Sequence, residues 1–153
     1  MPVANVGSKW VGGDLVFFDK ATGTDVLRIT TSTLGMVFET GEWIATSVDK
    51  VFFTATRKYR VRGLTARVTV AGIDAGAVTA VVRKAASGVA IGSGTLLHTG
   101  TINLKGTADT NQVLTLSTTA ADLELAAGDS LALDFTGTLT SATGAVTANL
   151  IPV

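Results

Sequence analysis

The chain has no cysteine and only one histidine among its 153 residues. Without cysteine it can form neither a disulfide framework nor a metal site with thiolate ligands. With a single histidine it has no pair of imidazoles to hold zinc, and it contains no Asp-x-Asp-x-Asp-Gly calcium loop. We therefore expect no metal and no cofactor.

Charged residues are also scarce. They make up 16% of the chain, against roughly 25% in ordinary soluble domains, and the 12 bases and 12 acids cancel. A neutral chain has no bulk attraction for nucleic acid or for an anionic membrane. No apolar run approaches the roughly 18 residues of a membrane span, and Met1–Lys9 does not resemble the start of a signal peptide. Low charge with a mean hydropathy of +0.44 predicts surface hidden in subunit contacts; the alternative is an ordinary monomer rich in Thr, Ala and Gly.

Helix signals are nearly missing. No window of a dozen residues has apolar positions at helical spacing with proper caps, and the best candidate, residues 120–125, reads equally well as a turn that enters a strand. Threonine and valine are abundant, and both favour pleated surfaces because they branch at the β carbon. Glycines recur at short intervals, as strands joined by tight turns require.

Apolar and polar residues alternate in about seven or eight short segments between Arg57 and Val153. The parity of the alternation reverses at Gly63, which predicts a β-bulge there, because one extra residue turns a strand's side chains to the other face. The spacing predicts an all-β fold: a jelly roll or related β-sandwich over residues 57–153, preceded by a small β-rich region over residues 1–56. We place a soft boundary near residues 55–58.

The N-terminal region holds both tryptophans and all but one of the phenylalanines. Residues 15–18 and 26–29 are apolar and flank a polar stretch, which predicts a hairpin. Both sides of its first strand are apolar, and 56 residues are marginal as an independent fold. Aromatic side chains are favoured at the centres of interfaces, so we expect this region to bind a partner through Trp10, Phe17 and Phe18, with Lys9 as a charge contact. The alternative is that these aromatics form a small N-terminal core.

No catalytic constellation is evident. The single histidine, His98, has no Gly-x-Ser-x-Gly elbow to serve, and Gly92–Gly94 has the composition of a turn. We therefore expect a surface or loop histidine and predict that the chain is not an enzyme. Residues 7–9 lack the glycine spacing of a phosphate-binding loop. The carboxylates between residues 122 and 134 alternate with leucines, which favours a solvated strand face over a paired-carboxylate site.

The densest basic cluster lies on the first strand of the second half: Arg57, Lys58, Arg60, Arg62 and Arg67. Single-stranded nucleic acid would need interleaved aromatics for stacking, and only Tyr59 is present. We expect instead that Arg57, Arg60 and Arg62 form ion pairs at a subunit interface, against an acidic region after residue 85. Ordinary solvated strand faces are the alternative.

Two stretches resemble a known family. Residues 7–23 (GSKWVGGDLVFFDKATG) are similar to the opening of structural proteins encoded near the capsid genes of tailed phages. Residues 126–137 (AAGDSLALDFTG) and the terminal strand 144–153 are similar to phage jelly-roll modules. The chain thus resembles tailed-phage capsid decoration (cement) proteins, while residues 35–56 match no pattern of the family.

The resemblance implies homotrimers on the outer capsid surface, bound to the major capsid protein at local or true threefold positions, with no catalytic residues. The expected function is therefore shell stabilisation. A second reading is a receptor- or glycan-binding head fibre or tail adhesin, for which Trp10, Trp43 and Tyr59 would supply stacking platforms. A hydrolase is a third reading, which no constellation of residues supports.

Overall fold

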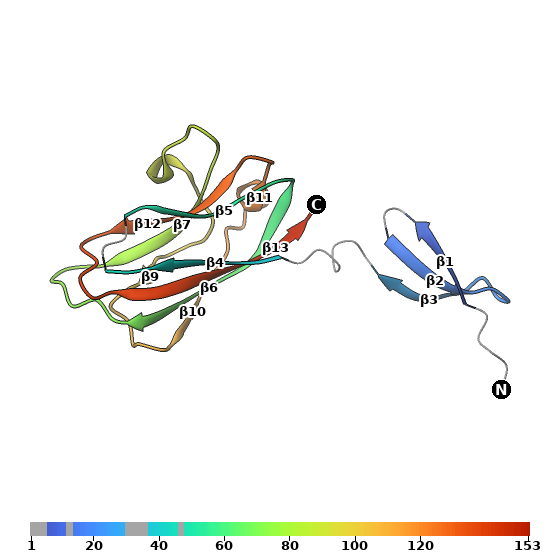
Figure 1. The fold of residues 1–153 in the computed structure, drawn as a ribbon, viewed down its shortest axis with the longest axis horizontal. Coiled ribbons are helices and arrows are strands. Elements are labelled where there is room, and N and C mark those ends of the chain that lie inside the picture. Colours follow the sequence, from blue (N-terminus) through green and yellow to red (C-terminus); the bar gives the residue numbers. More distant parts are fainter. Residues whose placement is uncertain (1–5, 12–13, 30–36, 46–47) are drawn as a thin grey trace.

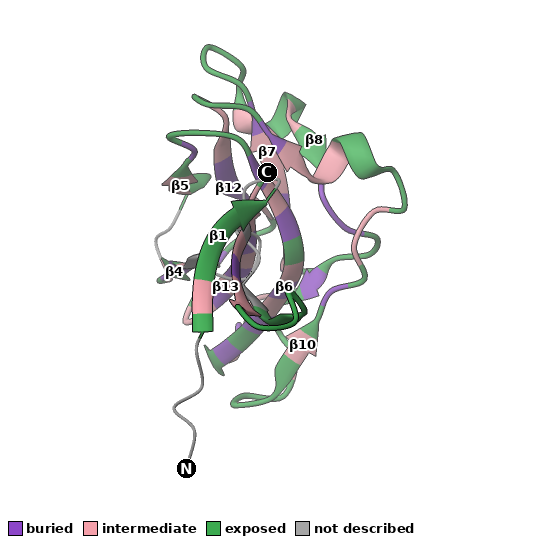
Figure 2. Cartoon of the chain, turned by 90° about the vertical axis from the view of Figure 1, so that its right-hand side faces the viewer, coloured by how far each residue is buried: buried purple, intermediate pink, exposed green. Residues whose placement is uncertain are grey.

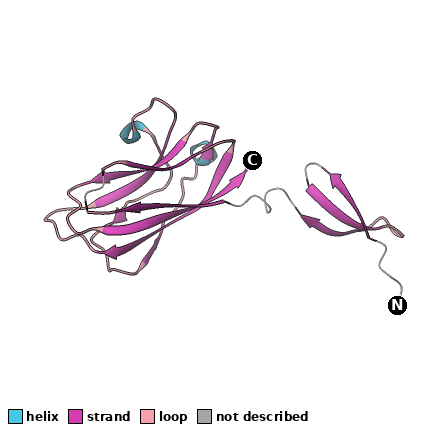
Figure 3. Cartoon of the chain, in the orientation of Figure 1, coloured by secondary structure: helices cyan, strands magenta, loops and turns pink. Residues whose placement is uncertain are grey.

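The computed structural model describes residues 6–11, 14–29, 37–45 and 48–153. Its elements are strands apart from two single-turn 3-10 helices, η1 (Ile91–Ser93) and η2 (Ala120–Leu123) (Figure 3). The all-β prediction is confirmed. The strands form three antiparallel sheets, of which two pack as a sandwich and the third lies apart at the N-terminal side (Figure 1).

The N-terminal sheet has the order β1 (Val6–Val11), β2 (Asp14–Asp19) and β3 (Asp25–Ile29). The predicted hairpin is confirmed, since β2 pairs antiparallel with β3. Asp19 closes its turn: the Gly23 amide donates to the Asp19 carbonyl over 2.7 Å, and the Ala21 amide donates to the Asp19 carboxylate over 2.7 Å. Gly23 has a φ of +72°, a conformation that glycine adopts without strain.

The sandwich is built from two five-stranded sheets. The first sheet has the order β10 (Asn111–Val113), β6 (Tyr59–Val70), β13 (Thr143–Pro152), β4 (Val37–Trp43), with β11 (Glu124–Leu125) also beside β6. The second sheet has the order β5 (Lys50–Thr54), β12 (Ser130–Thr136), β7 (Thr79–Ala85), β8 (Thr95–Leu96), with β9 (Ile102–Asn103) also beside β7.

The pairing between early and late strands is nested. β4 pairs with β13, β5 with β12, β6 with β10 and β11, and β7 with β8 and β9. The first four strands of the sandwich therefore meet the later ones in reverse order, and consecutive strands β4 to β7 alternate between the two sheets.

The sandwich starts earlier in the sequence than we predicted. We expected a boundary near residues 55–58, but β4 and β5 precede it and each occupies a place in a sandwich sheet. The physical reason is that both are edge strands with an incomplete apolar alternation, so their sequence does not show which sheet covers them. The described part of the sandwich begins at Val37.

The core lies between the sheets, and buried residues alternate with more exposed ones along β6 and β13 (Figure 2). On β6 the inward row is Tyr59 and Val61, then Leu64, Ala66 and Val68. The predicted bulge at Gly63 is confirmed, because Gly63 pairs with Asn149 while the next pair is Val61 with Leu150. The bulge returns the apolar residues on both sides of Gly63 to the same core.

Gly144 lies on β13 where this strand packs closely against β6 and Trp43. A β carbon at this position would lie 2.3 Å from the Arg67 carbonyl oxygen and 2.5 Å from a ring carbon of Trp43. We expect Gly144→Ala to lower the free energy of unfolding by about 3 kcal/mol because neither neighbour is a flexible side-chain tip. Gly92→Ala is the matched control, since a β carbon there meets nothing within 4 Å, and its effect should stay within about 0.5 kcal/mol. Equal urea midpoints for the two variants would contradict the packing described.

Candidate binding surface

The register of the N-terminal sheet sorts the four expected binding residues onto two faces. β1 and β2 pair without a register shift, with Trp10 opposite Leu15, Ser8 opposite Phe17, and Gly7 opposite Phe18. Directly paired residues share a face and neighbours along a strand alternate. Trp10 and Phe17 therefore lie on one face, whereas Lys9 and Phe18 lie on the other.

The first face, called here the apolar face, carries Val6, Trp10, Leu15, Phe17 and Leu27, together with the polar Ser8 and Asp19. Trp10 is 68% exposed, Leu27 54% and Val6 45%, and Leu15 and Phe17 are half-buried. Figure 2 shows β1 as almost wholly exposed. Large apolar side chains gathered on one exposed sheet face are typical of an interaction site, because soluble proteins rarely leave such a patch uncovered.

The opposite face is a small packed unit. The Lys9 ammonium lies 4.9 Å from the centre of the Phe18 ring and 3.6 Å from the Asp25 carboxylate. Gly7 leaves room for the same ring, since a β carbon there would lie 2.6 Å from a Phe18 carbon. Val16, beside Lys9 in the register, is fully buried. On this face the aromatic side chain thus packs within its own sheet, whereas Trp10 on the apolar face is mostly exposed.

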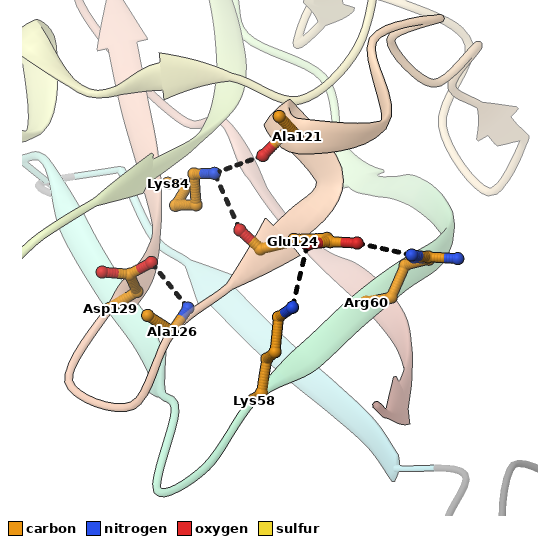
Figure 4. A network of polar contacts seen from close by, with 7 residues as sticks. All are labelled: Lys58, Arg60, Lys84, Ala121, Glu124, Ala126 and Asp129. Atoms are coloured by element: carbon orange, nitrogen blue, oxygen red, sulfur yellow. Dashed lines mark hydrogen bonds and ion pairs between the residues drawn. The ribbon is translucent and has the colours of Figure 1, made fainter.

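The expected interface arginines lie on β6 and just before it, where Glu124 forms the centre of a polar network (Figure 4). The Arg60 guanidinium contacts one oxygen of the Glu124 carboxylate, and the Lys58 ammonium lies 3.2 Å from the other. These two cations hold the pKa of Glu124 below its usual range. Lys84 donates to the backbone carbonyls of Ala121 (2.8 Å) and Glu124 (2.7 Å), which fixes η2 and β11.

The other two arginines differ from Arg60. The Arg57 guanidinium lies 5.6 Å from the centre of the Tyr59 ring. Arg62 is exposed at the bulge, and within the described residues it has no ion pair or side-chain hydrogen bond. The structure thus shows Arg60 paired within its own chain, whereas Arg62 is the one of the three arginines that has neither an ion pair nor an aromatic contact among the described residues.

His98 is buried, with 2% of its surface exposed, where we expected a surface or loop histidine. Its Nε2 accepts a hydrogen bond from the Val82 amide over 2.9 Å, and its Nδ1 lies 3.2 Å from the Thr99 carbonyl oxygen. The neutral ring therefore carries its proton on Nδ1. β8 pairs with residues 83–84 of β7, and β9 pairs with residues 79–80 of β7. Val82 lies between these two pairings, and the imidazole accepts its amide hydrogen bond there.

Both ring nitrogens of His98 are thus used by backbone groups, so this imidazole has no free nitrogen to act as a base for a hydroxyl nucleophile. The nearby Ser117 hydroxyl instead donates to the Asp122 carboxylate over 2.6 Å. In the part of the chain that the structure describes, no group of three or more histidine, aspartate or glutamate side chains is placed to hold a metal ion. No helix among the described residues is long and apolar enough to cross a membrane.

Comparisons of the chain with protein-family models, curated proteins and solved structures found no match.

The role of His98 predicts a pH dependence. Burial lowers the pKa of His98 below the ordinary value of 6.5, with the Thr99 carbonyl opposing this weakly. The unfolded chain then binds a proton at a higher pH than the folded chain, so the free energy of unfolding falls as pH drops below about 6.5, with a slope of at most about 1.4 kcal/mol per unit.

His98→Gln is the control, because the glutamine side chain does not titrate and its amide oxygen can still accept the hydrogen bond from the Val82 amide. Urea unfolding between pH 7 and 5 should show a smaller slope in this variant than in the wild type. The pairing of Glu124 is lost only at lower pH, since its depressed pKa lies below that window. Equal slopes for both proteins would show that the pKa of His98 does not differ between the folded and the unfolded chain, and would contradict this prediction.

Proposed function

We propose that the chain is a capsid decoration protein of a tailed phage, which binds the major capsid protein from outside the shell as a homotrimer and stabilises the shell. The observation that carries the proposal is the apolar face of the N-terminal sheet. It presents Trp10 and Leu27 more than half exposed, on a sheet whose strands pair only with one another in the described chain.

The two parts of the chain do not share a core. The cluster of buried residues that fills the sandwich contains none from β1, β2 or β3. A sheet of three strands is near the lower limit of independent stability, and covering one face with a partner would remove several large apolar side chains from water. Such an arrangement suits a small gripping unit attached to a larger and independently packed module.

The nested strand pairing supports a jelly roll as the class of the sandwich, because a jelly roll is a double sheet of eight strands wound as two Greek keys. β4 to β7 supply the first four strands, and the later strands return in reverse order beside them. The trimer rests on the low charge content and on the resemblance to decoration proteins.

The adhesin reading has less support. It needs exposed aromatic platforms beside polar groups, and two of its three candidates, Trp43 and Tyr59, are buried in the sandwich core. Trp43 packs edge-on against Phe135, with ring centres 6.5 Å apart, and Tyr59 packs against Phe53 at 5.5 Å. Only Trp10 remains exposed, and it belongs to the apolar face.

A pair of exposed apolar residues tests the proposal. Trp10→Ala should weaken binding to undecorated capsids about 30-fold, which corresponds to about 2 kcal/mol, because an aromatic anchor would lose its contact area. Val113→Ala is the control, since Val113 is 79% exposed but lies on the sandwich, and it should bind as the wild type does. Co-sedimentation with capsids measures both. Equal binding by the two variants would count against the apolar face as the gripping surface.

Truncation separates the two parts of the chain. Residues 37–153 should remain folded and trimeric but should no longer bind capsids, because the truncation keeps every strand of the sandwich and removes the N-terminal sheet. Residues 57–153 should fail to fold, since β5 and the core residue Trp43 on β4 would be lost. Circular dichroism, light scattering and capsid co-sedimentation give the three readouts. A protein of residues 37–153 that decorates capsids normally would refute the assignment.

A further inference from the structure

Natural sheets protect their edge strands against pairing with other chains, by shortness, bulges or charged side chains. Most edges of this protein carry such a device. β8, β9, β10 and β11 have two or three residues each. β3 and β5 each pair with a register shift, and β4 carries Glu39 and Glu42.

β1 differs from these edges. It is six residues long, pairs with β2 without a register shift, and is exposed at every position except the half-buried Gly7. It contains no proline, and its one charged side chain, Lys9, is held by the Phe18 ring and the Asp25 carboxylate on one face of the sheet. Among the described residues no strand pairs with its second edge.

We propose that β1 pairs antiparallel with β1 of a second copy of this chain, about a twofold axis at Ser8. On a capsid, the pairing would link neighbouring decoration units laterally, and this part of the inference rests on the proposed function. The pairing itself is a property of the chain alone.

The faces of the sheet restrict the register. In an antiparallel pair, opposed residues share a face, so residue numbers that sum to an even value keep the two apolar faces on the same side. A sum of 17 is excluded by the backbone, because opposed residues in an antiparallel pair direct their N–H and C=O groups the same way relative to the partner, and residues of unequal parity direct them to opposite edges of β1. An even sum joins the two apolar faces into one six-stranded surface, with the twofold axis perpendicular to it.

Two even registers pair five residues each, and charge decides between them. A centre at Lys9 would set two ammonium groups directly opposite, which is unfavourable. A centre at Ser8 sets Trp10 opposite Val6 of the second copy, a cross-strand aromatic and β-branched pair, and sets Lys9 opposite Gly7. The N-terminal sheet adds no net repulsion, because β1 to β3 and their turns carry three acids and three bases.

Five paired residues on each chain bury far less area than a stable interface of about 1,600 Å². The contact is therefore weak between free chains and becomes effective where chains are concentrated. Binding to a shell would supply that concentration, and the perpendicular twofold would let both apolar faces rest on the shell together.

The absence of native cysteine permits a clean cross-linking test of the full chain without capsids. Ser8→Cys and Ala21→Cys are each incubated at about 1 mM in a glutathione redox buffer, and disulfide dimers are measured by non-reducing electrophoresis. Ala21, in the exposed hairpin turn, reports random encounter. We expect Ser8→Cys to form dimers at least about 10-fold faster than Ala21→Cys, because paired antiparallel residues have Cα separations that a disulfide can bridge.

The two possible registers give different results for Ser8→Cys, which keeps Lys9. Pairing centred at Ser8 predicts rapid disulfide dimers of Ser8→Cys, whereas pairing centred at Lys9 sets Ser8 opposite Trp10 and predicts none above random encounter. A Ser8→Cys rate equal to that of Ala21→Cys would therefore overturn the inference. Binding of reduced Ser8→Cys to capsids is measured separately, so a failure of self-pairing is distinguishable from a failure of the decoration function.

Discussion

The sandwich depends on the pairing of β6 with β13. These are its two longest strands, they lie side by side in the middle of the first sheet, and their inward rows supply much of the core. β13 also holds β4 in place on its other side, so removing it would leave two edges and open the core at once. The close approach of Gly144 to Trp43 and to the Arg67 carbonyl shows how little room this pairing leaves. Because the partners are far apart in sequence, the sheet forms only after large loops have closed.

Alternation in the sequence predicted those parts of the fold in which one strand face is buried. The inward rows of β6, β12 and β13 and the bulge at Gly63 all follow from period-two patterning. β4 and β5 were assigned to the wrong side of the boundary, since edge strands are covered by partners that only the topology reveals. His98 was missed for a related reason: the ladder gap that it fills exists only because β7 pairs with two separate short strands.

The candidate site was predictable in composition but not in geometry. Clustered aromatics near the N-terminus indicated a binding region, and adjacent residues such as Phe17 and Phe18 must point to opposite faces of a strand. Which of them shares a face with Trp10 depends on the register between β1 and β2, and no local signal encodes that register. The Arg60 contact with Glu124 likewise joins residues 64 positions apart, which a count of nearby charges cannot show.

The pairing of β4 with β13 has a mechanical consequence for the proposed role on a shell. A pull transmitted from the N-terminal sheet enters β4 at Val37, and β4 is paired with β13 over its whole length of seven residues. A force along the strand loads those hydrogen bonds in shear, so they resist together instead of breaking one by one as a zipper would. Detaching β4 therefore requires its hydrogen bonds with β13 to break together.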